Sequence, residues 1–221
     1  MSHIKFATRT PKDRWIEAGL QALAAGGPDA VRVEALAKAL GVTKGGFYGF
    51  FADRDALLTA MLDTWEREST DDVLARIEQE GGDPKTKIYR AGVLTLSNDR
   101  LLPIDLAVRD WARRDEAVAE RLRRVDNRRM GLLREMISTF CSDPDEVEAR
   151  SVLAFCLRIG EHFLAADHDG RTRAQVLRRA GDFLLDRTPG DVDVKAQEGN
   201  TADCTGNSAT SHPPNTKPYT R

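Results

Sequence analysis

Apolar residues recur every three or four positions along most of this chain, with polar residues between them. This spacing matches the 3.6-residue turn of an α-helix and differs from the strict alternation of a half-buried strand. The first stripe comprises Trp15, Ile16, Gly19, Leu20 and Leu23. Similar stripes follow one another up to about residue 187. The pattern therefore predicts an all-α protein.

The sharpest pattern lies between residues 33 and 51. Four residues form the apolar stripe of a short helix: Val33, Leu36, Ala37 and Leu40. Gly41 follows at a point where a left-handed residue would end that helix. Thr43 is a good N-cap for a second helix, because its hydroxyl can accept a hydrogen bond from a free backbone amide. Two short helices joined by a tight glycine turn predict a helix-turn-helix.

The second helix of this pair is predicted to have two distinct faces. Phe47 and either Phe50 or Phe51 point inward, whereas Lys44 and Tyr48 point outward. The N-terminal turn of such a helix faces the base edges of DNA, and Lys44 is the only long donor in that turn. Each glycine in this segment costs ~1 kcal/mol relative to alanine, so we expect full ordering only when the helix is packed or bound to DNA.

The stretch resembles the DNA-binding signature of TetR-family transcriptional regulators, closely over residues 10–62 and beyond them only in helical pattern. The matching residues are Leu36-Ala37, Gly41-Val42, Gly45, Phe47-Tyr48 and Phe51, followed by Asp53-Arg54-Asp55-Ala56-Leu57-Leu58. The resemblance implies an N-terminal three-helix DNA-binding domain and a C-terminal helical bundle for ligand binding and dimerisation, with about nine helices in all.

The predicted DNA-binding residues are Thr43, Lys44, Gly45, Gly46, Tyr48 and Arg54. Tyr48 resembles a family tyrosine that contacts a phosphate, and Arg54 matches a family lysine position with the same task. Phe50 stands where the family often has a histidine, which leaves a phosphate contact there open. Because Gly46 and Gly49 replace larger residues, recognition is expected to depend more on backbone approach or on DNA shape.

The start of the chain is polar and basic. For residues 1–9 an untethered terminus is favoured over an arm that reaches into a minor groove. Thr10-Pro11 then predicts a helix start, with the threonine as N-cap and the proline at the first helical position.

Six further helices are predicted, at about residues 53–80, 85–98, 104–113, 115–140, 144–167 and 171–187. Asp53 and Asp115 are the expected caps of two of them. Breaks are expected at Gly81–Pro84 and around Leu102-Pro103. The helix over residues 53–80 is long enough to connect the DNA-binding end to the remainder, so it is the candidate transmitter between them.

Three regions follow from these patterns. Residues 1–55 are predicted to bind DNA, and residues 56–187 to form the ligand-binding and dimerisation domain. After Thr188 the composition shifts to small and polar residues with almost no periodicity, so residues 188–221 are predicted to be a disordered tail.

The helix over residues 144–167 is apolar on two sides, which predicts that both sides are buried. One side can serve the subunit core, and the other needs a partner. The simplest partner is the same pair of helices from a second subunit, so we expect a homodimer through about residues 144–187. This region is also where the resemblance places the dimer interface.

The helix over residues 115–140 belongs to a segment with seven arginines between Arg113 and Arg129. Because acids are interleaved with them, the run is interpreted as a solvated face and not as an anion site. Arg129 is the exception, since it lies on the apolar stripe. We predict that it forms a partly buried ion pair with Asp126 and that this ion pair holds neighbouring helices together.

Charge and composition narrow the range of possible functions. The chain has a formal net charge of −2, but residues 1–60 carry eight Lys or Arg and six Asp or Glu, which suits a DNA-facing end. The three cysteines show no paired spacing, and no apolar run approaches the ~18 residues of a membrane span. We therefore expect a cytoplasmic protein without membrane contact.

The sequence contains no phosphate loop, nucleophile elbow or paired metal-ligand motif. We accordingly expect no catalysis, no cofactor and no metal site. His162 is interpreted as an interior or pocket-edge histidine. Five residues on the central helices are candidates for a ligand pocket, with ordinary core left open as the alternative: Trp65, Tyr89, Trp111, Met130 and His162.

Together these patterns predict a homodimeric, DNA-binding transcriptional regulator. The resemblance implies a repressor of a near-palindromic operator, which an unidentified small ligand releases by favouring a different state of the dimer. Two alternatives stay open: a regulator of the same fold that activates or has no ligand, and a helical interaction module that has lost DNA binding.

Overall fold

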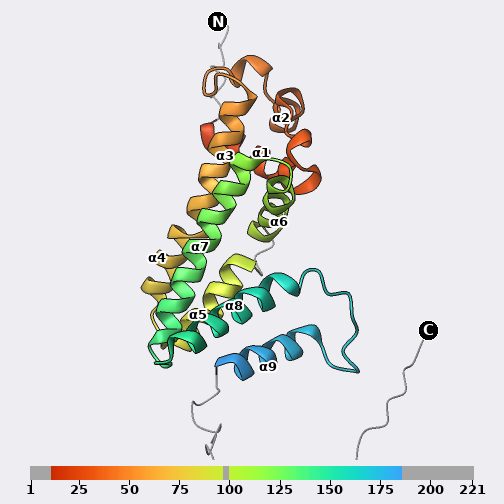
Figure 1. The fold of residues 1–221 in the computed structure, drawn as a ribbon. Helices are drawn as coiled ribbons and strands as arrows, with labels where there is room; N and C mark the ends of the chain where they lie inside the picture. The colour runs from red at the N-terminus through yellow and green to blue at the C-terminus, as the bar shows by residue number, and fades with distance from the viewer. Residues whose placement is uncertain (1–10, 97–99, 186–221) are drawn as a thin grey trace, which may run out of the picture. The chain divides into compact units, whose positions relative to one another are not determined.

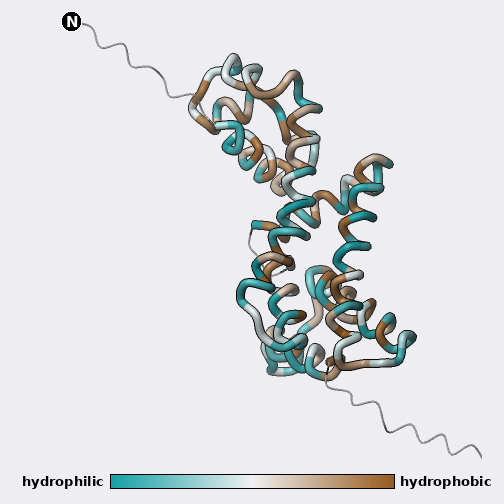
Figure 2. The backbone as a smooth tube through the Cα atoms, turned by 90° about the vertical axis from the view of Figure 1, so that its left-hand side faces the viewer, coloured by the Kyte–Doolittle hydropathy of each residue, from teal (hydrophilic) through white to brown (hydrophobic). Residues whose placement is uncertain are grey.

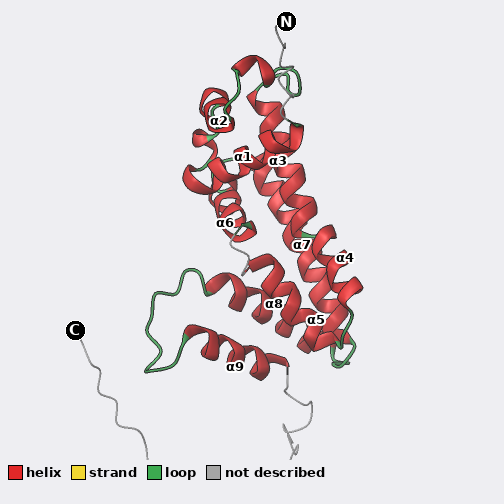
Figure 3. Ribbon diagram, turned by 180° about the vertical axis from the view of Figure 1, so that it is seen from behind, coloured by secondary structure: helices red, strands yellow, loops and turns green. Residues whose placement is uncertain are grey.

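The computed structural model describes residues 11–96 and 100–185. These residues form only helices and loops (Figure 3), which confirms the all-α prediction. The α-helices are α1 Lys12–Gly26, α2 Val33–Leu40, α3 Arg54–Ser69, α4 Asp71–Glu80, α5 Pro84–Leu96, α6 Leu101–Ala112, α7 Glu116–Ser138, α8 Pro144–Gly160 and α9 Arg173–Leu185, and the short 3₁₀ helices are η1 Pro28–Ala30 and η2 Lys44–Gly46. The arm predicted at residues 1–9 and the tail predicted at residues 188–221 lie outside the described residues.

The described residues, 11–96 and 100–185, belong to one compact unit. Within this unit, α1, α2 and the start of α3 gather at one end, and α4, α5, α8 and α9 gather at the other (Figure 1). α6 packs against both α1 and α7, and α7 packs against α5 and α8. Hydrophobic and hydrophilic residues alternate within single helices (Figure 2), as amphipathic helices require.

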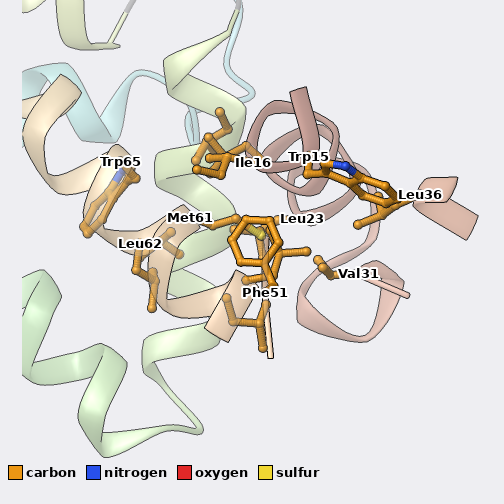
Figure 4. Close-up of a cluster of buried hydrophobic side chains, with 14 of the residues drawn as sticks. Trp15, Ile16, Leu23, Val31, Leu36, Phe51, Met61, Leu62 and Trp65 are labelled. Carbon is orange, nitrogen blue, oxygen red and sulfur yellow. The ribbon is translucent and has the colours of Figure 1, made fainter. Parts of the chain in front are cut away.

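One hydrophobic cluster holds the N-terminal helices together (Figure 4). Trp15 and Leu23 of α1 are fully buried in it, as the sequence pattern predicts. Met61 and Trp65 of α3 are fully buried in the same cluster. Because residues of α6 and α7 also belong to it, the N-terminal helices pack directly onto the remainder of the unit.

The helix predicted over residues 53–80 is in fact two helices. Thr70 interrupts it with φ −130° and ψ −76°, and its hydroxyl donates a hydrogen bond to Glu66 O at 2.7 Å. A local side-chain bond of this kind competes with the helix, and Asp71 and Asp72 favour the start of a new one through the helix dipole. The expected transmitter therefore consists of α3 followed by α4.

Other predicted boundaries need smaller corrections. Leu102-Pro103, predicted as a turn, lies in the first turn of α6, where the missing N–H of a proline is not needed. Pro11 is the N-cap of α1 and not its first helical residue. α8 ends at Gly160 and not near residue 167, because Gly160 O accepts from the amides of a following turn.

A buried ion-pair network joins α3, α6 and α7. Asp105 is 1% exposed. Its carboxylate accepts from Arg129 Nη2 at 2.9 Å, from Arg109 Nε at 2.8 Å and from Trp65 Nε1 at 3.3 Å. Arg109 also donates two bonds to Asp126, of 2.7 and 2.9 Å. The predicted Asp126–Arg129 pair is present only at 3.7 Å. The main partner of Arg129 is instead Asp105, a residue on the buried stripe of α6 that the sequence analysis missed.

Candidate nucleic-acid interface and internal cavity

The turn between α2 and the next segment has the geometry that the sequence predicts. Gly41 has φ 68° and ψ 31°, the left-handed conformation that glycine adopts without a Cβ clash. Its amide donates to Lys38 O at 3.1 Å, and the amide of Val42 donates to Ala37 O at 3.0 Å. These bonds satisfy the free carbonyls at the end of α2 and redirect the chain toward Thr43.

The segment after this turn is not a regular α-helix. η2 covers Lys44–Gly46, and residues 47–50 continue as turns. Thr43 occupies the N-cap position with an extended backbone, but its side chain makes no capping hydrogen bond, so that part of the prediction is wrong. Glycines at three positions of so short a segment disfavour a regular helix by ~1 kcal/mol each relative to alanine. The 3₁₀ turn is the result.

Aromatic packing holds this segment in place. Phe47 is fully buried, and its ring lies edge-on to Trp15 with a centroid distance of 5.4 Å. Phe51 is also buried and stacks on Phe47 at 5.2 Å. The prediction that Phe47 and one neighbouring phenylalanine point inward is therefore confirmed, and the turn is anchored on α1.

The predicted DNA-facing residues lie at the surface of this segment, although a Cβ added to Gly46 would point toward Trp15, 3.9 Å away. Thr43, Lys44 and Gly45 are exposed, and Gly46 is partly exposed. Tyr48 is 54% exposed, with one edge of its ring against Phe47. The structure thus brings these five predicted residues together on one short turn.

Lys44 forms an exposed ion pair with Glu34 of α2. The hydrogen bond with Glu34 raises the pKa of Lys44, and the same bond lowers the pKa of Glu34. Both groups are therefore charged at neutral pH. The pair places an acid beside the turn that the sequence analysis did not consider.

Arg54 is held by the protein backbone. Its Nε donates to Val31 O at 2.8 Å and its Nη2 donates to Pro28 O at 2.5 Å. These bonds tie the start of α3 to η1 and to Val31, the residue that follows it. Asp53 caps α3 as predicted, accepting from Ala56 N at 2.8 Å. A phosphate contact from Arg54 stays a prediction, and the structure adds a positioning role for this residue.

A cavity of about 740 Å³ lies at the other end of the unit. It opens to solvent and is lined by residues of α4, α5, α7, α8 and α9. Its wall is mainly apolar, with residues that include Val73, Leu74, Ile77, Ile88, Leu132, Leu133, Met136, Phe155, Leu177 and Leu184. Polar and charged residues also line it, among them Arg129, Lys87 and Arg158. A mainly apolar cavity of this size that also offers polar groups is typical of a small-molecule site.

Of the five candidate pocket residues, Tyr89 lies on the wall of this cavity. Trp65 and Trp111 belong instead to the hydrophobic cluster, and Met130 and His162 are not among the lining residues. His162 Nε2 is 3.3 Å from a carboxylate oxygen of Glu161. The apolar stripes of α4 and α5 form much of the wall, but such stripes look the same in sequence whether they face a core or a cavity.

α8 and α9 leave a large apolar surface exposed within the described part of the chain. Phe163, in the turn after α8, and Phe183 of α9 are each 71% exposed, and Leu153 and Leu164 are each more than half exposed. Large apolar patches of this kind mark interaction surfaces. Neither apolar stripe of α8 is fully buried in the single chain, because Val152, Leu153 and Cys156 are exposed and Phe155, Leu157 and Ile159 are only partly buried. The expectation that one stripe serves the subunit core is therefore wrong.

No helix in the described ranges is long and apolar enough to cross a membrane. Residues 16–61 match the family model for bacterial regulatory proteins of the tetR family. This family consists of regulators and not enzymes, in agreement with the expectation from the sequence. A search of curated proteins finds no match.

Three solved structures illustrate the likeness in fold. One is a transcriptional regulator from Rhodococcus sp. Rha1, with a TM-score of 0.61 and 22% identity over 80% of this chain and 95% of that chain. Another is a transcriptional regulator from Saccharomonospora viridis in complex with choline. Its TM-score is 0.62, with 18% identity over 78% of this chain and 94% of that chain. The third is AibR in complex with isovaleryl coenzyme A and operator DNA. Its TM-score is 0.55, with 16% identity over 78% of this chain and 98% of that chain.

Proposed function

Because this chain belongs to the TetR family of bacterial regulatory proteins, we propose that it is a homodimeric transcriptional repressor that binds a near-palindromic operator and is released by a small ligand. The observation that carries this proposal is the exposed turn from Thr43 to Tyr48, which is anchored from behind by Phe47 on Trp15. A rigidly held turn with exposed polar side chains suits a DNA groove. A regulator of chromosomal DNA acts in the cytoplasm.

The contacts proposed for this turn follow from exposure and chemistry. Lys44 is long enough to reach a guanine edge or a phosphate once Glu34 releases it. Tyr48 can donate its hydroxyl to a phosphate. Gly45 and Gly46 carry no side chain, so the backbone itself can approach the DNA closely. Arg54 supports the turn by holding α3 against η1 and Val31.

The exposed apolar surface of α8 and α9 supports dimerisation through about residues 144–187. Phe163 and Phe183 would be covered by the same surface of a second copy, which is how two-fold dimers bury such patches. A dimer presents two DNA-binding turns, and a palindromic operator offers two matching half-sites. We retain residues 1–55 as the proposed DNA-binding region and residues 56–187 as the ligand-binding and dimerisation region.

The cavity lined by Tyr89 supports control by a ligand. The similar proteins with choline and with isovaleryl coenzyme A each bind a small molecule. A ligand that binds better to a state with a different spacing of the two turns lowers operator affinity by the difference in its binding free energy. α4 contributes to the cavity wall and α3 leads from it to the DNA-binding turn, so these helices form the proposed route of transmission.

An electrophoretic mobility shift with the DNA that flanks the coding region of this protein tests the proposal. The full-length chain should shift this duplex at low salt, and Lys44→Ala and Tyr48→Phe should each weaken the shift. Lys87→Ala serves as the control, because it removes the same charge from α5, and it should leave the shift unchanged. Affinity should fall with salt, with each phosphate contact adding ~0.9 to the log–log slope.

The result of the mobility-shift experiment distinguishes the proposal from its two alternatives. If the duplex is never shifted, even at low salt, the proposal of a DNA-binding regulator is wrong and an interaction module remains. If it is shifted but metabolite extracts leave the affinity unchanged, control by a ligand is the part that fails.

A further inference from the structure

Arg158 of α8 brings unused hydrogen-bond donors to the cavity wall. Glu161 Oε1 lies 3.8 Å from its Nη1, which is too far for a hydrogen bond. Within the described residues the Arg158 guanidinium donates no hydrogen bond. The side chain is 21% exposed, and its nitrogens, unlike Arg129 Nη1, stay accessible. A molecule in the cavity can therefore reach donors that the protein itself does not use.

Contacts with α5 hold this guanidinium in place. Its Cζ lies 5.6 Å from the centre of the Tyr89 ring, within the range of a cation–π contact. A Cβ added to Gly92 would lie 2.5 Å from Nε and 2.9 Å from Nη2, so the guanidinium fits against α5 because position 92 has no side chain. Tyr89 and Gly92 line the cavity as well. The donors of Arg158 are thus held at a part of the wall that the cavity reaches.

Two other cations on the wall are already satisfied. Lys87 and Arg129 each donate to a carboxylate at 2.9 Å. Arg158 has only the more distant charge of Glu161, and that carboxylate also lies 3.3 Å from His162 Nε2. Of these three cations, Arg158 is therefore the one without a hydrogen-bonded carboxylate in the described part of the chain.

A carboxylate matches the donors of Arg158 better than other groups do. A guanidinium is planar, and it can donate two parallel hydrogen bonds to the two oxygens of one carboxylate. Such charge-assisted bonds are stronger than those to an uncharged oxygen. A ligand cation would instead be repelled by the guanidinium.

We propose that the cavity binds a molecule with an apolar body and a carboxylate, and that this carboxylate accepts hydrogen bonds from Arg158. The apolar part of the wall, which includes Ile77, Leu132 and Met136, would contact the body of the ligand. This inference rests on the proposed function, because it names the chemical class of the ligand that acts there.

Isothermal titration calorimetry of the full-length protein with octanoate, octanol and octylammonium tests the proposal. The three probes share one apolar chain and differ in the charge of the head group. The quantity to compare is the affinity of octanoate divided by that of octanol, because a general change in the apolar wall affects both probes alike. Wild type should bind octylammonium more weakly than octanoate.

The first variant is Arg158→Gln, which removes the charge and keeps a polar side chain. We expect the affinity ratio to fall ~10-fold, the effect of losing a hydrogen bond to a charged group. Lys87→Gln is the matched control, because it removes a wall cation that is already paired with Glu78. The ratio in this control should stay within ~2-fold of wild type.

The second variant is Gly92→Ala, which keeps the charge of Arg158 and moves its guanidinium. The added methyl would lie 2.5 Å from Nε, and the end of a flexible side chain can move away, so the fold should persist. Because the donors are displaced, we expect the affinity ratio to fall ~3–10-fold. Gly131→Ala, whose added methyl meets no atom within 4 Å, should leave the ratio unchanged.

The ionisation of the ligand bound to wild type does not depend on the folding of any variant. Nuclear magnetic resonance of carboxyl-labelled octanoate at about pH 6 should show an ionised bound ligand, because a guanidinium lowers the pKa of a carboxyl group whereas an apolar site alone raises it.

Several results would each overturn the inference: a protonated bound ligand, an unchanged ratio in Arg158→Gln or Gly92→Ala, an equal fall in Lys87→Gln, a preference for octylammonium, or no binding of any probe. If octanoate binds as expected but leaves operator affinity unchanged, the inference stands and control by such a ligand fails in the proposed function.

Discussion

A carboxylate as deeply buried as that of Asp105 is stable only while its cations stay beside it. Arg129 and Arg109 both donate to it, at 2.9 and 2.8 Å. We expect Asp105→Asn to lower the free energy of unfolding by ~3–5 kcal/mol, because Arg129 is left buried without its main counter-charge. Urea unfolding followed by circular dichroism measures this.

Asp110→Asn is the matched control on the same helix. Asp110 pairs with Arg114 at 2.6 Å, but both side chains are more than half exposed. Exposed pairs contribute ~0–1 kcal/mol, so this change should be nearly neutral. Equal losses in the two variants would contradict a special role for the buried network.

Acid should weaken the same network. Burial raises the pKa of Asp105, but the charges of Arg129 and Arg109 lower it by more, so its pKa lies below the ordinary value. Such a group stabilises the fold above its unfolded pKa of ~3.9, and this contribution is lost as pH falls through the lower folded value. Unfolding titrations below about pH 4 should show a steeper loss in wild type than in Asp105→Asn.

The charge of Glu34 should lower the affinity of the protein for DNA. It pairs with Lys44 and adds a negative charge beside the turn that we propose to meet phosphates. We expect Glu34→Gln to raise DNA affinity ~3–10-fold at low salt, with a smaller gain as salt screens the charge. Fluorescence anisotropy of a labelled duplex measures the affinity. Glu78→Gln, which frees Lys87 on α5, should have no effect, and a lower affinity in Glu34→Gln would refute the argument.

At the scale of single elements, local signals predicted the helix ends that depend on neighbouring backbone, but they missed a break inside a predicted helix. Gly41 and Asp53 act as expected, because a left-handed turn and an N-cap depend only on neighbouring backbone. Thr70 was not recognised as a break, because its effect depends on a rotamer that lets its hydroxyl reach Glu66 O. η2 is a 3₁₀ turn where a regular helix was expected, since its glycines remove the advantage of the α-helix.

The glycines of this turn allow a test that separates folding from recognition. A methyl group added at Gly45 would lie 3.8 Å from Thr43 Oγ1, and one added at Gly46 would lie 3.9 Å from Trp15. Both are ordinary contacts, so alanine at either position should leave stability unchanged or raise it by up to ~1 kcal/mol. If the bare backbone approaches DNA, Gly45→Ala should nevertheless lower operator affinity by tenfold or more, about 1.4 kcal/mol. Gly46→Ala should lower it less, because its methyl points toward Trp15.

Thermal unfolding and anisotropy on the same samples provide the two readouts. Gly131→Ala in α7 is the control, because an added methyl there meets no atom within 4 Å, and it should alter stability without altering DNA affinity. Unchanged DNA binding in both turn variants would show that close backbone approach is not needed.

At the scale of the whole molecule, the apolar surface of α8 and α9 should decide the oligomeric state. We expect Phe183→Glu to convert the proposed dimer into monomers, because a charge in the centre of an apolar interface is left without a partner. The monomer should still fold, since Phe183 is 71% exposed in a single chain. Sedimentation velocity measures the state, and operator affinity should fall with it.

Gln175→Glu introduces the same charge at an exposed position near the start of α9. It should leave the dimer intact. A Phe183→Glu variant that sediments like wild type would show that this surface does not join two copies.

The sequence by itself determined the helical class, the buried stripes such as that of Trp15, and the exposed turn around Lys44. These features depend on residues a few positions apart, which periodicity and turn chemistry describe directly. The tertiary structure alone decided that Asp105 meets Arg129 and that Tyr89, but not Trp65, faces a cavity. Such encounters join segments far apart in the chain, and they depend on how whole helices pack against one another.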